Sequence, residues 1–455
     1  MHVMTRFFTP FVRWNVLWQA GVFLLVLTLS ACGQDKHGQS GVEPRPNIIL
    51  IFSDDVGIGD IHCTGGPFST PNIDALAKGG MLFENCYSTP LCGPSRCQTL
   101  TGRYPFRTGL INNNSDNSIQ PDREVMIPTV LKKAGYATAC SGKWGQMSLG
   151  PIEWGFDESM MFSNGKGGRY WLDKANGDYL LNGKPTAAPG KYFPDLSHEY
   201  VVDFIERHKD GPFFVYYPMS HSHGPILPTP DSKPGADATR LYADNIEYMD
   251  KLVGRLMGEL DRLHLRGKTL VIFTGDNGTA RFGIEAGANV NGRPISGQKG
   301  TMLEGGSRVP LIANWPGTTP AGTANRDLID FSDFFATFAS LAGAPLPEGV
   351  VLDSRSFAGQ IEGRKGEPRD WVYVELNGNS YVRDARFKLT NKGEMFDLSN
   401  APFEEKPVAA DSTDSAALAA RPALQKVLND HPTAPGEENN KKAKKKAKKK
   451  ARRNA

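Results

Sequence analysis

Runs of apolar residues without polar alternation recur along the chain, and they predict strands that are buried on both faces. Such strands are typical of a largely parallel sheet that helices cover on both sides. Four of these runs occupy residues 47–52, 136–140, 213–217 and 269–274. Segments with helical spacing lie between them, and two begin with a proline, at Pro71 and Pro128. The alternation predicts an α/β fold with a doubly wound, mixed but mostly parallel sheet flanked by helices.

The longest predicted helix, residues 241–263, indicates how these helices pack. Its apolar residues recur at spacings of four and three positions, namely Tyr242, Ile246, Met249, Val253, Leu256 and Leu260. This spacing places them on one helix face, as expected of a helix that covers a sheet. A shorter helix is predicted at residues 333–343. We therefore expect one large domain over residues 47–365.

The pattern changes in the C-terminal part of the chain. Short runs at residues 371–376, 380–383, 387–390 and 395–398 alternate with glycine and asparagine turns. Such runs predict a small antiparallel sheet, which we expect to form a C-terminal subdomain over residues 366–421. The remaining residues, 422–455, are polar and end in a lysine-rich segment, so we predict a disordered basic tail.

The N-terminal segment is typical of an export signal. Arg6 and Arg13 supply positive charge, and an apolar run follows at residues 16–29. This run is shorter than the about 20 apolar residues that a transmembrane helix needs. The protein is therefore predicted to leave the cytoplasm, and the bacterial periplasm or cell surface is its expected location.

The end of this signal resembles a bacterial lipobox. It reads Leu-Ser-Ala-Cys, and in a lipobox the cysteine, here Cys32, carries the lipid after cleavage. The alternative is an ordinary secretory signal cleaved near Ala31. We expect a signal peptide at residues 1–32 and a flexible tether at residues 33–46, with a lipid anchor to the membrane at Cys32.

Composition and charge narrow the class of protein. The chain has 455 residues, of which 39% are hydrophobic, and its mean hydropathy of −0.38 is that of a soluble globular protein. Residues 441–453 include eight lysines and two arginines; removing these ten charges from the formal net charge of +3 leaves −7. The body of the protein is therefore mildly acidic, which argues against a nucleic-acid-binding protein.

Polar residues follow each of the four predicted strands. In open α/β sheets, ligands bind at the carboxyl ends of the strands. The residues at these ends are Asp54 and Asp55, Lys143, His221 and His223, and Asp276 and Asn277. Adjacent carboxylates repel each other unless a cation lies between them. Oxygen ligands from two strands therefore predict a site for Ca²⁺ or Mg²⁺ in an enzyme.

Residues 91–103, Leu-Cys-Gly-Pro-Ser-Arg-Cys-Gln-Thr-Leu-Thr-Gly-Arg, hold the candidate nucleophile. A helix is predicted to begin at Pro94, since proline suits a first helical position. Cys92 then lies near free backbone N–H groups that favour a thiolate, and Arg96 can grip a tetrahedral oxyanion. The phosphatase loop does not fit, because it has His before its Cys and Arg after five intervening residues, where this chain has Leu and Gln. An ordinary cysteine before a helix is the alternative.

The motif Cys-x-Pro-Ser-Arg at residues 92–96, followed by Thr-Gly-Arg at residues 101–103, resembles the signature of the type I, formylglycine-dependent sulfatases. The resemblance extends in the same order over residues 47–398. It implies the alkaline-phosphatase-like fold and a sulfuric ester hydrolase that removes sulfate from an organic sulfate. It also implies that a formylglycine-generating maturation enzyme oxidises Cys92, and that the hydrated aldehyde is the nucleophile.

The same resemblance implies roles for the polar residues. The implied ligands of Ca²⁺, with Mg²⁺ less favoured, are the formylglycine at Cys92 and Asp54, Asp55, Asp276 and Asn277. The implied cationic residues around the sulfate oxygens are Arg96, Lys143 and Lys299. His223 is implied to meet the oxygen of the leaving group.

One position departs from the pattern of this family. The family usually reads Gly-Lys-Trp-His after the strand at residues 136–140, and this chain has Gly145 in place of the histidine. That histidine normally acts as the base that expels sulfate. Gln146 can form a hydrogen bond there but accepts no proton at neutral pH, and His221 is a possible substitute.

The substrate class rests on weaker signals. A loop with aromatic residues surrounds Arg169, and together with export it favours a sulfated carbohydrate, with Arg169 as a substrate-binding candidate. The alternatives are a small aryl sulfate, or a phosphodiester or phosphonate cleaved by the same fold. A protein of another class, an anchored binder that holds sulfated glycans without cleaving them, is also compatible with the missing histidine.

Four cysteines remain after Cys32 and Cys92 are set aside: Cys63, Cys86, Cys97 and Cys140. They allow three disulfide pairings, and the sequence neither selects one nor excludes free thiols.

Overall fold

The computed structural model describes residues 45–115, 119–145, 147–162, 172, 178–281 and 288–436. They belong to one compact unit, which begins at Pro44. The predicted signal peptide and most of the tether, with Cys32, lie outside the described residues, as does the lysine-rich end of the chain. In the described part, no helix has both the length and the apolar character needed to cross a membrane.

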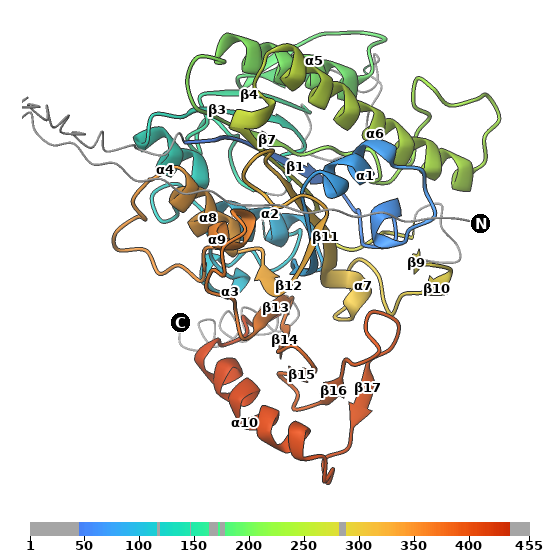
Figure 1. The fold of residues 1–455 in the computed structure, drawn as a ribbon, viewed down its shortest axis with the longest axis vertical. Helices are drawn as coiled ribbons and strands as arrows, with labels where there is room; N and C mark the ends of the chain where they lie inside the picture. The colour runs from blue at the N-terminus through green and yellow to red at the C-terminus, as the bar shows by residue number, and fades with distance from the viewer. Residues whose placement is uncertain are drawn as a thin grey trace, which may run out of the picture. The chain divides into compact units, whose positions relative to one another are not determined.

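A ten-stranded sheet organises the described part of the molecule (Figure 1). Its strands are β1 (Asn47–Ser53), β2 (Met81–Tyr87), β3 (Ala137–Gly142), β4 (Glu158–Phe162), β5 (Tyr179–Leu181), β6 (Lys184–Thr186), β7 (Phe213–Tyr217), β8 (Thr269–Gly275), β11 (Arg308–Asn314) and β12 (Thr323–Asp330). They lie in the order β12-β2-β11-β8-β1-β7-β3-β4-β5-β6. The central five, from β8 to β4, are parallel, whereas β11, β5 and β6 pair with their neighbours in antiparallel fashion.

Helices cover both faces of this sheet. They are α1 (Pro71–Lys78), α2 (Cys92–Thr101), α3 (Pro105–Thr108), α4 (Ile127–Lys133), α5 (Phe193–Arg207), α6 (Ala238–Arg262), α7 (Glu304–Ser307), α8 (Asp333–Leu341) and α9 (Ala358–Ile361), with 3₁₀ turns at His62–Thr64 and Arg266–Lys268. Side chains of α1, α5 and α6 pack on one face, and those of α2, α4, α8 and α9 pack on the other (Figure 1).

Strand β1 shows why its sequence lacks polar alternation. Ile48, Leu50 and Phe52 belong to the core on the α2/α8 side, and Ile49 and Ile51 belong to the core on the α5/α6 side. Successive side chains of a strand point to opposite faces, so a strand between two helical layers needs apolar residues at every position. The predicted doubly wound, mostly parallel fold class is confirmed.

Helix α6 begins three residues before the predicted start at residue 241. Asp237 caps it, because its carboxylate accepts a hydrogen bond from the backbone N–H of Arg240. The predicted apolar stripe is buried along α6, as at Ile246 and Leu256. The periodicity therefore predicted which face of α6 packs on the sheet, and the capping residue explains why the helix begins earlier than predicted.

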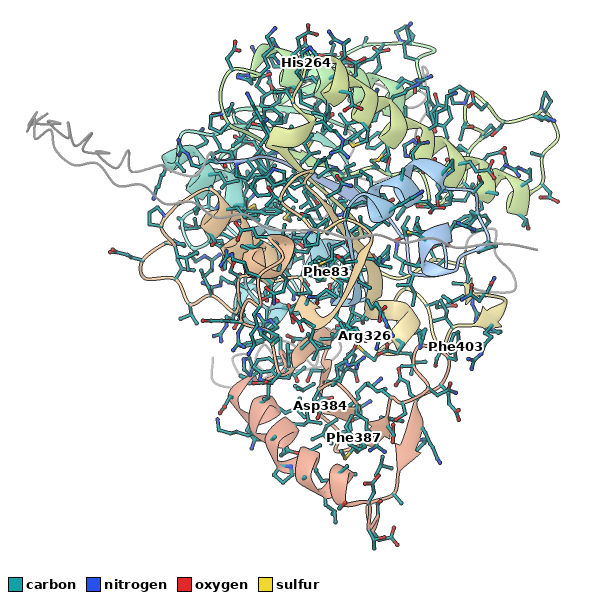
Figure 2. The ribbon with its side chains drawn as sticks, in the orientation of Figure 1. Phe83, His264, Arg326, Asp384, Phe387 and Phe403 are labelled. Carbon is teal, nitrogen blue, oxygen red and sulfur yellow. The ribbon has the colours of Figure 1, made fainter. Side chains whose placement is uncertain are left out.

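The C-terminal residues form a second, five-stranded antiparallel sheet, as predicted. Its elements are β13 (Val372–Leu376), β14 (Asn379–Arg383), β15 (Phe387–Thr390), β16 (Met395–Asp397) and β17 (Lys406–Val408), and helix α10 (Ser415–Asp430) packs on it. A short ribbon of β9 (Asn289–Val290) and β10 (Arg293–Pro294) is separate from it. Phe387 belongs to the core of this subdomain, apart from Phe83 in the core of the main sheet (Figure 2).

The subdomain extends further than the sequence predicted. Residues 422–430 were expected in a disordered tail, but α10 continues to Asp430. Leu424 and Leu428 are buried against the small sheet, which supplies apolar contact that composition alone does not reveal. Pro422 lies inside the helix.

Cys63, Cys86, Cys97 and Cys140 are thiols in the structure. Of the alternatives that the sequence left open for these four residues, the structure has the unpaired one.

Candidate active site

The four strands that carry polar residues at their ends are neighbours in the sheet. Because β8, β1, β7 and β3 are adjacent and parallel, their carboxyl ends meet at one edge. Backbone hydrogen bonds join these ends, from Asp276 N to Ser53 O at 2.8 Å and from Asp54 N to Met219 O at 2.9 Å. A third bond runs from Lys143 N to Pro218 O at 2.9 Å. The sheet therefore gathers residues that are far apart in the sequence.

Two consecutive carboxylates reach the same place because the chain turns after β1. In an extended strand, Asp54 and Asp55 would point in opposite directions. Asp55 instead has a φ of 57°, in the left-handed region that aspartate tolerates better than most residues. Its backbone N–H donates to Asp276 Oδ1 at 2.9 Å, and Lys299 Nζ lies 2.7 Å from its Oδ2.

Helix α2 brings Cys92 and Arg96 to this edge of the sheet. The helix begins at Cys92, two residues before the predicted start, so Pro94 lies within its first turn. Arg96 follows one turn later, fully buried, and its Nε and one terminal nitrogen lie 3.0 and 2.7 Å from Asp276 Oδ2. The other terminal nitrogen donates to the carbonyl of Lys143 at 2.8 Å. Arg96 therefore ties the helix to two strand ends.

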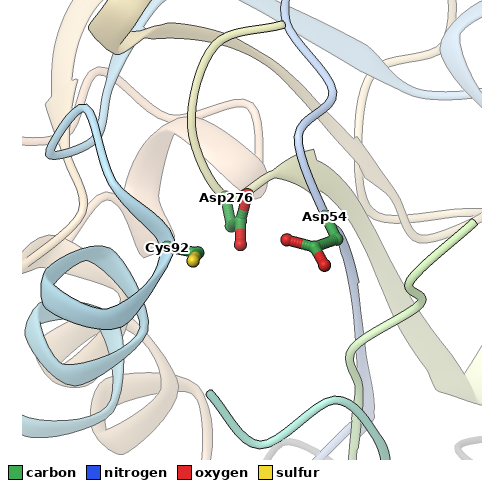
Figure 3. A group of neighbouring side chains, drawn as sticks. All are labelled: Asp54, Cys92 and Asp276. Carbon is green, nitrogen blue, oxygen red and sulfur yellow. The ribbon is translucent and has the colours of Figure 1, made fainter. Parts of the chain in front are cut away.

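Cys92 completes a compact cluster with two acids. One ligand atom each from Asp54, Cys92 and Asp276 lies within 4.8 Å of the others, and all three side chains are buried. Figure 3 shows the two carboxylates facing each other, with Cys92 beside Asp276. A second group with the same spacing joins Asp54 and Asp55 to His223. The carboxylate oxygens of these two groups suit a divalent cation.

The charges of the site balance in pairs. Lys143 Nζ contacts both oxygens of Asp54, at 2.8 and 2.7 Å, in a buried ion pair. Burial alone would raise the pKa of Asp54, but the positive charges of Lys143 and Arg96 bring it well below its ordinary value. Burial and the negative charges of Asp54 and Asp55 raise the pKa of Asp276, although the positive charge of Arg96 opposes this shift. A bound cation would relieve the electrostatic repulsion between such crowded carboxylates.

The two histidines after β7 occupy different surroundings. His223 is partly buried near Asp54, and its Nδ1 lies 2.8 Å from the carbonyl oxygen of Gly224, so Nδ1 carries the proton and donates it. Asp54 raises the pKa of His223, but burial and the charge of Lys143 outweigh this and lower it below its ordinary value. His221 packs against the rings of Tyr192 and Tyr248, and burial lowers its pKa to about 3.

Gly145, where the resembled pattern has a histidine, lies against Arg96. Its φ is 104°, and a Cβ atom added there would come within 3.0 Å of Arg96 Cδ. Gln146 and Arg169, the other predicted substrate-binding residues, lie outside the described residues. The structure thus brings together Cys92, Arg96 and the strand-end residues other than His221, which packs between aromatic rings, and leaves Gln146 and Arg169 undescribed.

Asn113 is a site residue that the sequence did not predict. Its Nδ2 donates to Cys92 Sγ at 3.4 Å, and its Oδ1 accepts from the backbone N–H of Gly93 at 3.0 Å. Two serines are also placed here, since Ser95 Oγ donates to the carbonyl of Asp276 and Ser222 Oγ to that of Asp54. In the sequence, Asn113 is marked only by the run of three asparagines at 112–114. No periodic pattern of residues relates this run to Cys92.

Comparison with known proteins decides the family. A family model described as Sulfatase matches residues 46–344. The chain belongs to the sulfatase family. This sulfatase is 35% identical to the N-acetylgalactosamine-6-sulfatase of Canis lupus familiaris over 372 residues, 72% of this chain and 68% of that protein. It is 32% identical to the arylsulfatase A of Homo sapiens over 435 residues, 87% of this chain and 83% of that protein.

Solved structures agree with this assignment. The sulfatase superposes on the crystal structure of Ps i-CgsB with a TM-score of 0.74 and 28% sequence identity, over 85% of this chain and 92% of that one. The protein is therefore a sulfuric ester hydrolase, and the predicted family, fold and enzyme class are confirmed.

Proposed function

We propose that this sulfatase removes sulfate from sulfated carbohydrates, with a formylglycine made from Cys92 as nucleophile and Ca²⁺ as cofactor. The observation that carries this proposal is the cluster of Cys92, Asp54 and Asp276 at the carboxyl edge of the sheet. The hydrated aldehyde of formylglycine would supply a hydroxyl nucleophile beside these two acids.

The residues present fit a Ca²⁺ ion. Asp54, Asp55 and Asp276 offer carboxylate oxygens, and all are fully buried. Asn277 is buried as well, and its Oδ1 accepts no hydrogen bond within the described part of the chain. A buried carbonyl oxygen without a partner is costly unless a ligand uses it. When bound, Ca²⁺ would neutralise the carboxylates and polarise a sulfate oxygen.

The cationic residues then bind the substrate. Once the carboxylates are neutralised, Lys143 and Lys299 would be available to hold the sulfate oxygens and to offset their negative charge. Arg96 stays fixed by Asp276 and lies one helical turn after position 92. His223 holds a proton on Nδ1 through Gly224, so Nε2 is the nitrogen that, after taking up a second proton, would deliver it to the oxygen of the leaving group.

The relatives support a carbohydrate substrate. One acts, by name, on N-acetylgalactosamine-6-sulfate, and Ps i-CgsB has been solved in complex with a neocarrahexaose. Arylsulfatase A is also similar, so an aryl sulfate is a reasonable test substrate. The membership in the sulfatase family disfavours both the phosphodiesterase alternative and the non-catalytic binder.

Maturation and location complete the proposal. A formylglycine-generating enzyme would be the partner that oxidises Cys92 before the chain folds, since the residue is fully buried afterwards. Export, and a lipid anchor at Cys32 in the periplasm or at the cell surface, stay predictions from the N-terminal sequence.

The substitution Cys92→Ala tests the proposed nucleophile. We expect sulfate release from nitrophenyl sulfate and from a sulfated N-acetylhexosamine to disappear, while the circular dichroism spectrum stays unchanged. The matched control is Cys63→Ala, a partly exposed thiol on the 3₁₀ turn, which should retain activity. Sulfate release by Cys92→Ala above the buffer blank would contradict the proposal, and preferential cleavage of a nitrophenyl phosphodiester by the native enzyme would favour the phosphodiesterase alternative.

A further inference from the structure

A cavity of about 250 Å³ lies beside the cluster of Cys92 and the acids. Its walls are the asparagine run at residues 112–114, Leu91 and Gly300 next to the cluster, and Leu376 with Asn377 from the turn between β13 and β14. We call it the asparagine pocket. Its volume is slightly below the about 300 Å³ at which small-molecule sites begin, so it suits one sugar ring.

The asparagine pocket is lined by neighbours of the reacting residue. Asn113, which lines it, donates to Cys92 Sγ, and Leu91 directly precedes Cys92. On another wall, Gly300 follows Lys299 and donates its backbone N–H to Pro90 O at 2.8 Å. A Cβ at Gly300 would meet nothing closer than 4.0 Å, so this wall leaves the space open. A group held in the pocket is therefore next to the bond that is cleaved.

The C-terminal subdomain fixes the far wall of the pocket. Asn377 and Gly378 have φ angles of 48° and 91° and connect β13 to β14, as an Asn-Gly pair does in a tight hairpin. Asn112 Nδ2 donates to Asn377 Oδ1 at 3.2 Å, and Asn377 N donates to Ile111 O at 3.1 Å. These bonds hold the turn against the asparagine run.

The lining has one chemical character. Among the described residues that line it, the polar side chains are all amides and the apolar ones are leucines, so none carries a charge. Amides donate to and accept from hydroxyl and acetamido groups, and the leucines offer contact to ring C–H groups. A carboxylate or a second sulfate would lose its hydration here without gaining an ion partner.

We propose that the asparagine pocket binds the sugar ring that bears the scissile sulfate, and that it selects an uncharged hexose or N-acetylhexosamine. The inference rests on the proposed function, since it names the substrate for the same site. The β13–β14 turn then determines which sugars enter, and the C-terminal subdomain becomes part of the specificity of the enzyme.

Two substitutions test the pocket directly. Asn114→Ala removes the exposed side-chain amide of residue 114. Asn377→Gly removes the side-chain amide of residue 377, and glycine readily adopts the left-handed backbone that Asn377 has. Each should raise KM for 6-sulfated N-acetylgalactosamine by about fivefold, the effect of one lost hydrogen bond, with a smaller rise for nitrophenyl sulfate. The matched control is Asn429→Ala on the exposed side of α10, which should match the native KM for both substrates.

The expected preference for uncharged sugars provides a second test. The native enzyme should cleave 6-sulfated N-acetylgalactosamine with a kcat/KM at least about tenfold above that for a 2-sulfated hexuronate, since the carboxylate is poorly solvated in the pocket. Equal kcat/KM for the two sugars, or unchanged KM in both asparagine variants, would overturn the inference while sulfate release still supported the proposed function. No sulfate release from any of these esters would overturn both.

Discussion

At the scale of single residues, position 145 most clearly separates this enzyme from the pattern that its sequence resembles. Gly145 has a φ of 104°, which side chains rarely adopt, and faces Arg96 Cδ. A histidine at this position would need a different backbone or a displaced Arg96. Arg96 in turn holds Asp276 and the Lys143 carbonyl, so its displacement would disturb the cluster.

This geometry predicts that restoring a side chain at 145 harms the enzyme. Gly145→Ala and Gly145→His should each lower kcat by about tenfold or more, because small displacements of reacting groups are costly. The matched control is Gly135→Ala, which has a similar φ of 83° and no atom within 4 Å. It pays the same backbone cost, about 1–2 kcal/mol, and should keep kcat. A higher kcat in Gly145→His would show that the site lacks only the histidine.

The sequence predicted the charged residues of the site better than its neutral ones. Asp54, Asp276 and Lys143 each follow a recognisable buried strand, so the sheet alone brings them together. Asn113 follows no such strand, and its contact with Cys92 depends on the path of a loop. His221 precedes His223 by two residues, yet it packs between aromatic rings, which its position in the sequence does not reveal.

At the scale of helices and strands, the site depends on neighbouring strand ends that the proposed cation would join. Asp54 and Asp55 come from β1, while Asp276 and Asn277 come from β8, and the two strands pair in parallel along seven residues. Both pairs are buried, so the proposed cation would be bound by the fold and not by one flexible loop. Its removal should therefore affect the stability of the whole domain.

Calcium should raise the melting temperature of the enzyme, and EDTA should lower it. At a Ca²⁺ concentration of 100 times Kd, the free energy of unfolding should increase by about 2.7 kcal/mol. Titration calorimetry should detect binding to the native protein but not to Asn277→Ala, which removes one oxygen ligand. Asp411→Asn, an exposed acid, is the control and should bind normally. Undiminished binding by Asn277→Ala would exclude this site as the calcium site.

Element boundaries were predicted less well than element types. The apolar runs predicted the central strands because burial on both faces leaves only one pattern. Helix α6 starts early because Asp237 caps it, and α10 passes residue 421 because the small sheet covers Leu424 and Leu428. Both differences arise from contacts that lie outside the helix itself.

At the scale of the whole molecule, the C-terminal subdomain contacts the asparagine run beside Cys92. The sequence predicted it as a small antiparallel sheet, with no indication that its first turn would reach the residues around Cys92. The turn at Asn377 contacts Asn112, which lies 265 positions away in the chain. Alternating strand patterns predict a sheet but not the surface against which it packs, so the asparagine pocket became visible only in three dimensions.

The mass of the tryptic peptide covering residues 79–96, taken from active enzyme of the native host, tests the central claim most directly. Oxidation of the Cys92 thiol to an aldehyde lowers the mass of this peptide and leaves a group that carbonyl reagents label. We predict the lighter peptide, in an amount that follows the specific sulfatase activity from one preparation to the next. Fully active enzyme in which this peptide retains the unmodified Cys92 thiol would contradict the account.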